Sequence, residues 1–167
     1  MKYLTRDNIT LALSIIGSAG TVITWIVSYV KSRKNLSVKI VKLLRSKNIM
    51  ILYIMINNKS RLPIAIESLS ITYKDKIFPC ALIPKKTFER TTKTGSVIKE
   101  NKSYYTLQLP IYLPSLGGTS GYFLFDIPEE VSQNLSTPLT VLIHSNRGKA
   151  TEMKLPFESV ESWEEMF

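Results

Sequence analysis

An uncharged, apolar stretch near the start of the chain constrains everything that follows it. Residues Ile9–Val30 read ITLALSIIGSAGTVITWIVSYV and contain no aspartate, glutamate, lysine or arginine. A helix of about 20 such residues matches the hydrocarbon core of a lipid bilayer. The stretch has no charged face, so a buried helix of a soluble protein is the weaker interpretation. With its flanking charges it predicts a transmembrane anchor over residues 1–34, and a lipid bilayer as the first partner.

A cleavable signal peptide is the alternative interpretation of this stretch. The basic residues before it could form the start of such a signal, and Gly17–Ala19 resembles a small-residue cleavage site. The apolar sequence nevertheless continues through Thr21–Val30, whereas a cleavable signal ends sooner. The segment also contains no cysteine, which excludes processing as a lipoprotein.

Basic residues are more numerous after the apolar stretch than before it. Only Lys2 and Arg6 precede it, whereas seven basic residues and no acidic residue lie in Lys31–Lys47. Basic residues beside a transmembrane helix tend to stay on the cytoplasmic side. The sequence therefore predicts a single-pass protein of the cytoplasmic membrane, with the N-terminus outside and the main domain in the cytoplasm. The reverse orientation would make that domain an extracytoplasmic binding module.

The same basic segment predicts contact with anionic lipid headgroups. Lys31, Arg33 and Lys34 lie nearest the apolar stretch and are the expected contact residues. Although the formal net charge of the chain is +9, nucleic acid is not an expected partner. Binding to nucleic acid would require aromatic or groove-reading features beside the charges, and none accompanies them.

Small and hydroxylated residues recur along the apolar stretch at spacings of three and four, which places them on one side of a helix. Ser14, Gly17, Ser18 and Thr21 form the predicted association face. Small residues let helices approach closely in lipid, so this face is expected to bind a second copy or another membrane protein. The simpler alternative is that such residues are common in membrane helices, where their hydroxyls bond to their own backbone.

The remainder of the chain alternates apolar and polar residues between turn signals, which predicts a mainly β fold. We expect an antiparallel, immunoglobulin-like β-sandwich of about 7–8 strands over residues 35–155, with a jelly roll or small barrel as alternatives. No helix is expected before the tail, and the polar segment Pro84–Lys102 is expected to be a loop. The predicted strands are Leu36–Val41, Asn48–Asn58, Ile64–Tyr73, Ile77–Ile83, Ser103–Leu113, Ser120–Ile127, Leu139–Ser145 and Lys149–Leu155.

Three local features refine this prediction. Asn48–Asn58 is nearly all apolar, which is typical of a central strand covered on both faces. Pro79 places its strand at a sheet edge, because proline donates no ladder hydrogen bond. The alternation of Ile64–Tyr73 is interrupted at Glu67 and Ser68, which indicates a bulge.

Residues 156–167 form an acidic tail. Phe157, Val160, Trp163 and Phe167 are spaced at three and four, which predicts a short amphipathic helix. Three roles are open for it. It could fold back onto the basic segment Lys31–Lys47, present Trp163 and Phe167 to a docking partner, or simply pack one aromatic ring on the sandwich.

No constellation of residues for catalysis, metal binding or cofactor binding occurs in the sequence. Cys80 is the only cysteine, so no intrachain disulfide is possible. His144 is the only histidine and lies in the apolar run Val141–Ser145, where a strand histidine is the expected structure. There is no phosphate-binding loop and no Gly-x-Ser-x-Gly motif. We expect no enzyme activity and no cofactor, since a hydrolase based on His144 lacks any supporting motif.

Two resemblances to known proteins can be stated. The run Asn57–Ile71, with Asn-x-Ser, a proline and then alternating isoleucines, is similar to an early hairpin of immunoglobulin-like bacterial domains. The abundance of lysine, isoleucine, asparagine and serine looks like an AT-rich Gram-positive bacterium or its phage. The layout of one span, a basic stop and one small domain resembles small prophage membrane proteins, including those that exclude superinfecting phage.

These resemblances imply a bacterial cytoplasmic membrane as the location. The prophage likeness further implies a host-defence role in which DNA entry is blocked through a membrane partner. The residues themselves predict a non-enzymatic binding or adaptor protein, because function must be argued from a site and no catalytic site is present.

Overall fold

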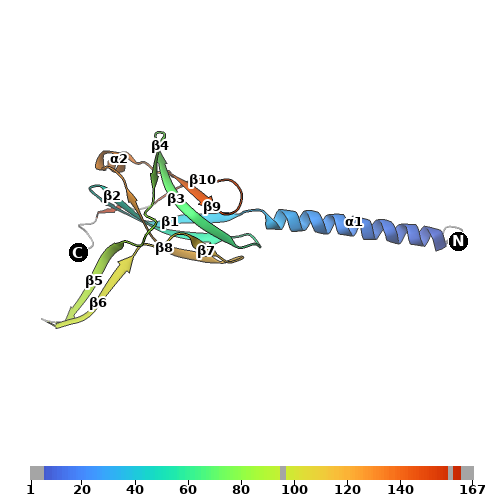
Figure 1. Ribbon diagram of the computed structural model, residues 1–167, viewed down its shortest axis with the longest axis horizontal. Helices are drawn as coiled ribbons and strands as arrows, with labels where there is room; N and C mark the ends of the chain where they lie inside the picture. Colours follow the sequence, from blue (N-terminus) through green and yellow to red (C-terminus); the bar gives the residue numbers. More distant parts are fainter. Residues whose placement is uncertain (1–5, 95–96, 158–159, 163–167) are drawn as a thin grey trace. The chain divides into compact units, whose positions relative to one another are not determined.

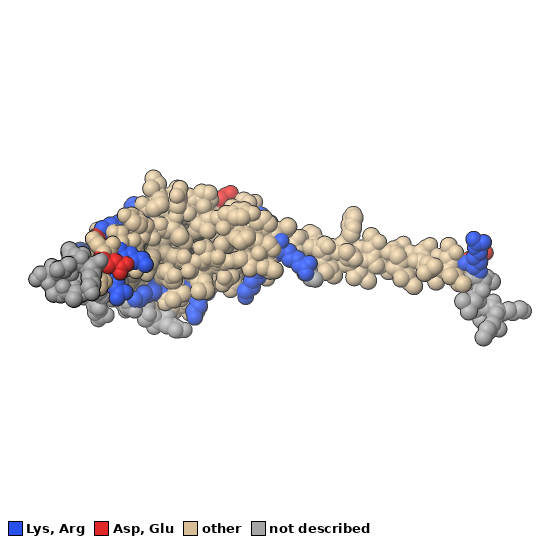
Figure 2. All heavy atoms as spheres, turned by 90° about the horizontal axis from the view of Figure 1, so that it is seen from below, with Lys and Arg blue, Asp and Glu red and all other residues tan. Residues whose placement is uncertain are grey.

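The structure is a computed structural model that describes residues 6–94, 97–157 and 160–162. The chain divides into two compact units, Met1–Arg33 and Lys34–Phe167. The described part of the first unit is helix α1 (Arg6–Ser32), which confirms the predicted apolar helix. Its segment Arg6–Val30 is long and apolar enough to cross a membrane, and none of it is buried. On the face shown in Figure 2, charged side chains of α1 lie only at its two ends.

Apart from the short helix α2, the regular elements described in the second unit are strands, which confirms the mainly β, antiparallel architecture (Figure 1). One sheet has the order β11-β1-β2-β8, a second has the order β10-β9-β3-β4 with β7 also paired to β3, and β5 and β6 form a separate ribbon. Among the described strand pairs, only β1 and β11 are parallel, and a single parallel bridge also joins Thr106 to Tyr122. The elements are β1 (Leu36–Ser46), β2 (Ile49–Asn58), β3 (Ile64–Tyr73), β4 (Lys76–Pro79), β5 (Lys86–Thr94), β6 (Val97–Tyr105), β7 (Ile111–Leu113), β8 (Gly118–Asp126), α2 (Glu129–Asn134), β9 (Leu139–Ser145), β10 (Thr151–Leu155) and β11 (Val160–Ser162).

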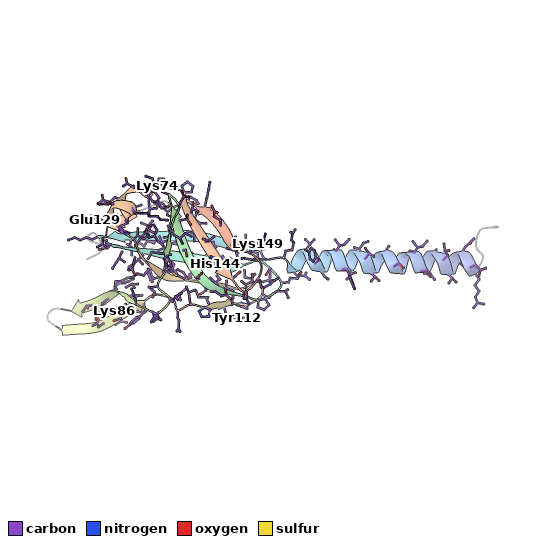
Figure 3. The ribbon with its side chains drawn as sticks, turned by 45° about the horizontal axis from the view of Figure 1, so that its top comes forward. Lys74, Lys86, Tyr112, Glu129, His144 and Lys149 are labelled. Atoms are coloured by element: carbon purple, nitrogen blue, oxygen red, sulfur yellow. The ribbon has the colours of Figure 1, made fainter. Side chains whose placement is uncertain are left out.

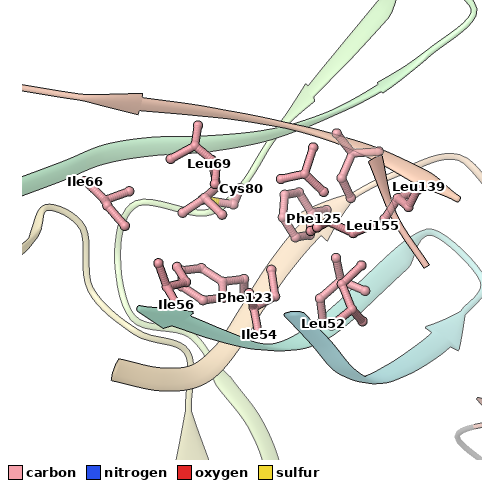
Figure 4. Close-up of a cluster of buried hydrophobic side chains, with 14 of the residues drawn as sticks. Leu52, Ile54, Ile56, Ile66, Leu69, Cys80, Phe123, Phe125, Leu139 and Leu155 are labelled. Atoms are coloured by element: carbon pink, nitrogen blue, oxygen red, sulfur yellow. The ribbon is translucent and has the colours of Figure 1, made fainter. Parts of the chain in front are cut away.

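The two larger sheets face each other across one apolar core (Figure 4). Leu52, Ile54 and Phe123 approach it from one sheet, and Leu69 and Leu139 approach it from the other. Two sheets packed through alternating inward-facing residues form a β-sandwich. The immunoglobulin-like relationship is a finer statement and stays a prediction.

Strand β2 lies between β1 and β8, which confirms the predicted central strand. One face of β2 contributes to the main core. Its other face buries Ile51 in a smaller cluster with Leu44 and Leu124, while Met55 is exposed. Within the described residues, the second face of β2 is therefore covered only in part.

Several turns and edges also follow the sequence prediction. The β3–β9 register shifts between Ile66 and Ser68, at the expected bulge. β4 is an edge strand that pairs only with β3. Gly148, between β9 and β10, has a φ of +67°, the left-handed conformation that glycine adopts at little cost. His144 lies in β9 with its side chain exposed.

Several expectations are wrong. The described residues form eleven strands rather than about 7–8. The strand expected over Ser103–Leu113 is divided between the end of β6 and β7, and the one expected over Ile77–Ile83 ends at Pro79. The segment Pro84–Lys102 is not a loop but contributes most of the β5–β6 hairpin. A short helix, α2, precedes the tail. Finally, Val160–Ser162 is a strand rather than part of an amphipathic helix, and it pairs with Leu43–Arg45 of β1. This pairing satisfies backbone groups at the open edge of β1 and brings the chain back onto the basic segment.

The loops at the end of the β unit where the chain arrives from α1 are tied together by hydrogen bonds. We call residues 34–35, 57–63, 114–118 and 146–149 the proximal end. Asn58, which is 1% exposed, is central to it. Its Nδ2 donates to the carbonyl oxygens of Leu62 and Pro114, each at 2.9 Å, and its Oδ1 accepts from the backbone N–H of Ser60 at 3.0 Å and from the Ser60 hydroxyl at 2.6 Å.

Replacing Asn58 by alanine is expected to lower the free energy of unfolding by about 2–3 kcal/mol, because buried donors and acceptors would lose their partners. Urea denaturation of the full chain in detergent, followed by tyrosine fluorescence, measures this change. Asn35→Ala is the matched control, since Asn35 is exposed at the same end. Equal denaturation midpoints for the two variants would contradict the structural role of Asn58.

Candidate functional site

Two of the four residues of the predicted association face of α1, Ser14 and Ser18, line a shallow groove along the helix, together with Thr10, Ala19 and mostly apolar neighbours. Gly17 and Thr21 do not line this groove. A β-carbon added at Gly17 would meet no atom within 4 Å, so the helix backbone at Gly17 is open to close approach by another helix.

The hydroxyl groups on α1 bond to the helix backbone. The hydroxyl of Ser18 donates to the carbonyl oxygen of Ser14 at 2.8 Å, and that of Thr21 donates to Gly17 at 2.9 Å. These bonds satisfy polar groups that lipid cannot, which is the simpler of the two interpretations of these residues. Association through this face would therefore depend on close packing at Gly17 rather than on hydrogen bonds from Ser18 or Thr21.

The three predicted lipid-contact residues differ in their surroundings. The side chain of Lys31 lies outside the described residues, and Arg33 is exposed. Lys34 is half-buried, and its Nζ donates to the carbonyl oxygen of Lys149 at 2.9 Å. Burial lowers the pKa of Lys34. Lys34 thus belongs to the β unit as well as to the basic segment.

A cluster of aromatic rings lies where the β5–β6 hairpin meets β8. We call Tyr53, Phe88, Tyr104 and Tyr122 the hairpin root. Phe88 stacks on Tyr104 with ring centroids 4.5 Å apart. Phe88 also contacts Tyr122 edge to face, with ring centroids 5.0 Å apart. Tyr53 contacts Tyr122 at 4.8 Å in a similar edge-to-face geometry. Such contacts stabilise beyond their buried area, so the rings fix the hairpin to the sandwich.

Backbone contacts hold the same junction. The backbone N–H of Thr106 donates to the carbonyl oxygen of Lys85, and that of Leu107 donates to the carbonyl oxygen of Tyr122, each at 2.9 Å. An isolated two-stranded ribbon is marginally stable in water. These bonds and the aromatic cluster together explain how a polar hairpin can project from the sandwich (Figure 1).

The electrostatics of the hairpin are mild. Burial raises the pKa of Tyr122, and the neighbouring Tyr53 and Tyr104 add smaller contributions in the same direction. The hydrogen bond from Lys86 is the largest cause of the lowered pKa of Glu89. Farther along, a shallow hollow is lined by Arg90, Thr92, Glu100, Lys102 and Tyr104. These groups can donate hydrogen bonds to a bound molecule and accept hydrogen bonds from it.

The sequence does not predict the hairpin root. The segment is rich in lysine and threonine, a composition that predicts a loop. The available signal was the pairing of Phe88 near one end of this segment with Tyr104 and Tyr105 near the other, because aromatic and β-branched residues favour strands. The predicted docking residues Trp163 and Phe167 lie outside the described residues.

Within the described part of the chain, no group of three or more His, Cys, Asp or Glu side chains could hold a metal ion. Cys80 is buried in the core, and burial is the main cause of the raised pKa of its thiol. Its surroundings are those of a structural cysteine rather than a nucleophile. Comparison of the sequence with protein-family models and with curated proteins finds no match.

Proposed function

We propose that this chain is a non-enzymatic binding or adaptor protein anchored in a bacterial cytoplasmic membrane by α1. The observation that carries the proposal is the exposure of the apolar side chains of α1, such as Leu11, Ile16 and Trp25. A helix that is uncharged on every side, mostly apolar and uncovered by protein must be covered by lipid or by another helix. The excess of basic residues after α1 favours a cytoplasmic location for the β unit.

The hairpin root and the projecting β5–β6 ribbon are the proposed recognition surface of the β unit. Loops and hairpins that project from a rigid scaffold commonly carry binding. In lipid, the side of α1 around Gly17 and Gly20 would pack against a second copy or a membrane partner. Exclusion of superinfecting phage would be one form of such an adaptor activity. In that case, expression of the protein would reduce entry of phage DNA while phage adsorption to the cells is retained.

Photo-crosslinking in intact cells tests the recognition surface. A photoreactive residue at Tyr105, which is exposed on β6, should capture a defined protein in a stoichiometric product. The same residue at the exposed position Ser136 is the matched control and should capture none. Identical products from the two positions, or none from Tyr105, would contradict the proposal.

Protease treatment of intact, wall-free cells tests the orientation. The β unit should survive protease added outside and be digested once the membrane is opened. Digestion from outside would place the β unit on the extracytoplasmic side and would overturn the proposed orientation.

A further inference from the structure

The proximal end of the β unit is strongly basic. None of its segments, residues 34–35, 57–63, 114–118 and 146–149, contains an aspartate or a glutamate. Most of its charged side chains are exposed, the half-buried Lys34 and Arg147 being the exceptions. Figure 3 shows Lys149 and Tyr112 toward one end of the β unit, and Lys74 and Glu129 toward the other. The basic residues of the proximal end are Lys34, Lys59, Arg61, Arg147 and Lys149.

These basic residues occur in loops that contact one another. The N–H of Lys59 donates to the carbonyl oxygen of Asn35 at 2.8 Å, and Lys34 reaches Lys149 as described above. Nη1 of Arg147 donates to the carbonyl oxygen of Leu62 at 3.3 Å. The loops therefore present their charges together on one surface, rather than as separate mobile segments.

Exposed apolar side chains accompany the charges. Leu116 is 72% exposed and Leu62 is 44% exposed. Leu116 has a φ of +55°, a conformation that L-residues with side chains seldom adopt. Tyr112, which is 68% exposed, lies beside the start of β3 through its pairing with Ala65. Basic groups interspersed with leucine and tyrosine are typical of surfaces that lie in a membrane interface.

The length of chain between the two units limits how far this surface can lie from the end of α1. Helix α1 ends at Ser32 and β1 begins at Leu36, so only three residues connect them. Three fully extended residues span about 10 Å. The headgroup region on each side of the hydrocarbon core is about 5–8 Å thick, so a bilayer-spanning α1 would keep the proximal end within reach of the headgroups.

We propose that the proximal end binds the surface of an anionic bilayer. Lys59, Arg61 and Lys149 contact headgroup phosphates, and Leu62 and Leu116 enter the interface between headgroups and acyl chains. This binding rests on the proposed function, because it requires α1 to hold the β unit at the same membrane. This binding extends the lipid contact from the basic residues next to α1 to loops that are distant in the sequence. It also restricts rotation of the β unit about the short segment that connects it to α1.

Fluorescence of the full chain in lipid vesicles tests this proposal. The environment-sensitive dye NBD is attached at Ser115→Cys, next to Leu116, in a Cys80→Ala background. Vesicles contain phosphatidylcholine alone or phosphatidylcholine with phosphatidylglycerol. With phosphatidylglycerol, the dye emission should shift to the blue and intensify, and about 1 M salt should reverse the change because it reduces the screening length to about 3 Å.

Matched controls separate specific binding from general attraction. The dye at Ser136→Cys, beside Lys74 at the other end of the unit, should not respond to phosphatidylglycerol. Triple replacement of Lys59, Arg61 and Lys149 by glutamate should abolish the response at position 115. The same triple change at the exposed residues Lys47, Lys74 and Lys76 should leave the response in place.

The outcomes distinguish this inference from the proposed function. Equal emission in both lipids, with the protein still floating with the vesicles, would overturn the lipid-binding surface and leave the anchor intact. A shift in both lipids that grows with protein density would identify a second copy as the occupant and would also overturn it. Protein that fails to float with vesicles would overturn the membrane anchor, and the lipid-binding surface with it.

Discussion

Replacing Phe125 by alanine is expected to lower the free energy of unfolding of the β unit by about 3–5 kcal/mol. Phe125 is 0% exposed and lies on β8, opposite Met50 of β2. Its ring fills the space between the two larger sheets (Figure 4), so truncation removes apolar burial and leaves a cavity. A domain of this size has a total stability of only about 5–15 kcal/mol, so the loss would be a large fraction of it.

Urea denaturation of the full chain in detergent, followed by tyrosine fluorescence, would measure the effect. Tyr112→Ala is the control, because that aromatic side chain is mostly exposed and its removal should cost less than about 0.5 kcal/mol. Phe125→Leu should fall between them, since it restores part of the buried volume. Similar midpoints for Phe125→Ala and Tyr112→Ala would contradict the two-sheet core.

The parts of the fold that were predicted correctly are those in which burial leaves a periodic pattern. β2, β3 and β9 each bury alternate apolar residues against the core, and their boundaries follow closely from the sequence. The bulge after Ile66 was visible as a break in the same alternation. In these segments, local pattern and tertiary burial agree.

The β5–β6 hairpin was missed because most of its described side chains are exposed to solvent. A strand that buries neither face has no apolar alternation, so periodicity gives no signal. Its stability comes from non-local contacts, above all Phe88 and Tyr104 against Tyr122. Phe88 and Tyr104 are a local signal for the hairpin, but their contact with Tyr122 is not, because β8 lies on another segment of the chain.

The other errors have related causes. α2 spans only six residues, which is too short for a helical period, although Pro128 followed by Glu129 and Glu130 is a plausible start signal. In the tail, the spacing of Phe157 and Val160 suits a helix, but the open edge of β1 offers backbone partners that favour a strand. Phe157 itself packs against the core and lies 5.9 Å from the guanidinium of Arg45.

The proximal end was only partly predictable. The basic residues next to α1 are adjacent in sequence, and lipid contact followed from that position alone. Lys59 and Arg61 lie in the β2–β3 turn and Lys149 lies in the β9–β10 turn, and only the strand topology brings these two turns to one end of the β unit. The sequence predicts that a strand ends at Asn58. It does not show that the Asn58 side chain donates hydrogen bonds to the carbonyl oxygens of Leu62 and Pro114.

Replacing both Val22 and Ile23 by arginine is expected to remove the protein from the membrane. These residues lie near the middle of the apolar stretch, and both are exposed on α1. Each replacement should disfavour insertion by about 3–4 kcal/mol, counting both the charge gained and the apolar side chain lost. Together they change the insertion equilibrium by about five powers of ten.

Flotation of cell lysates in a density gradient measures this, because membranes float while soluble protein and aggregates do not. Val22→Leu with Ile23→Leu is the control and should float like the parent chain, since apolarity and helix propensity are kept. If the arginine variant still floats but is released from the membranes by alkaline carbonate, which strips proteins held by surface contacts, binding to membranes does not require α1 to cross them. The β unit would then be held by surface contacts, and the apolar helix would need a protein partner to cover it.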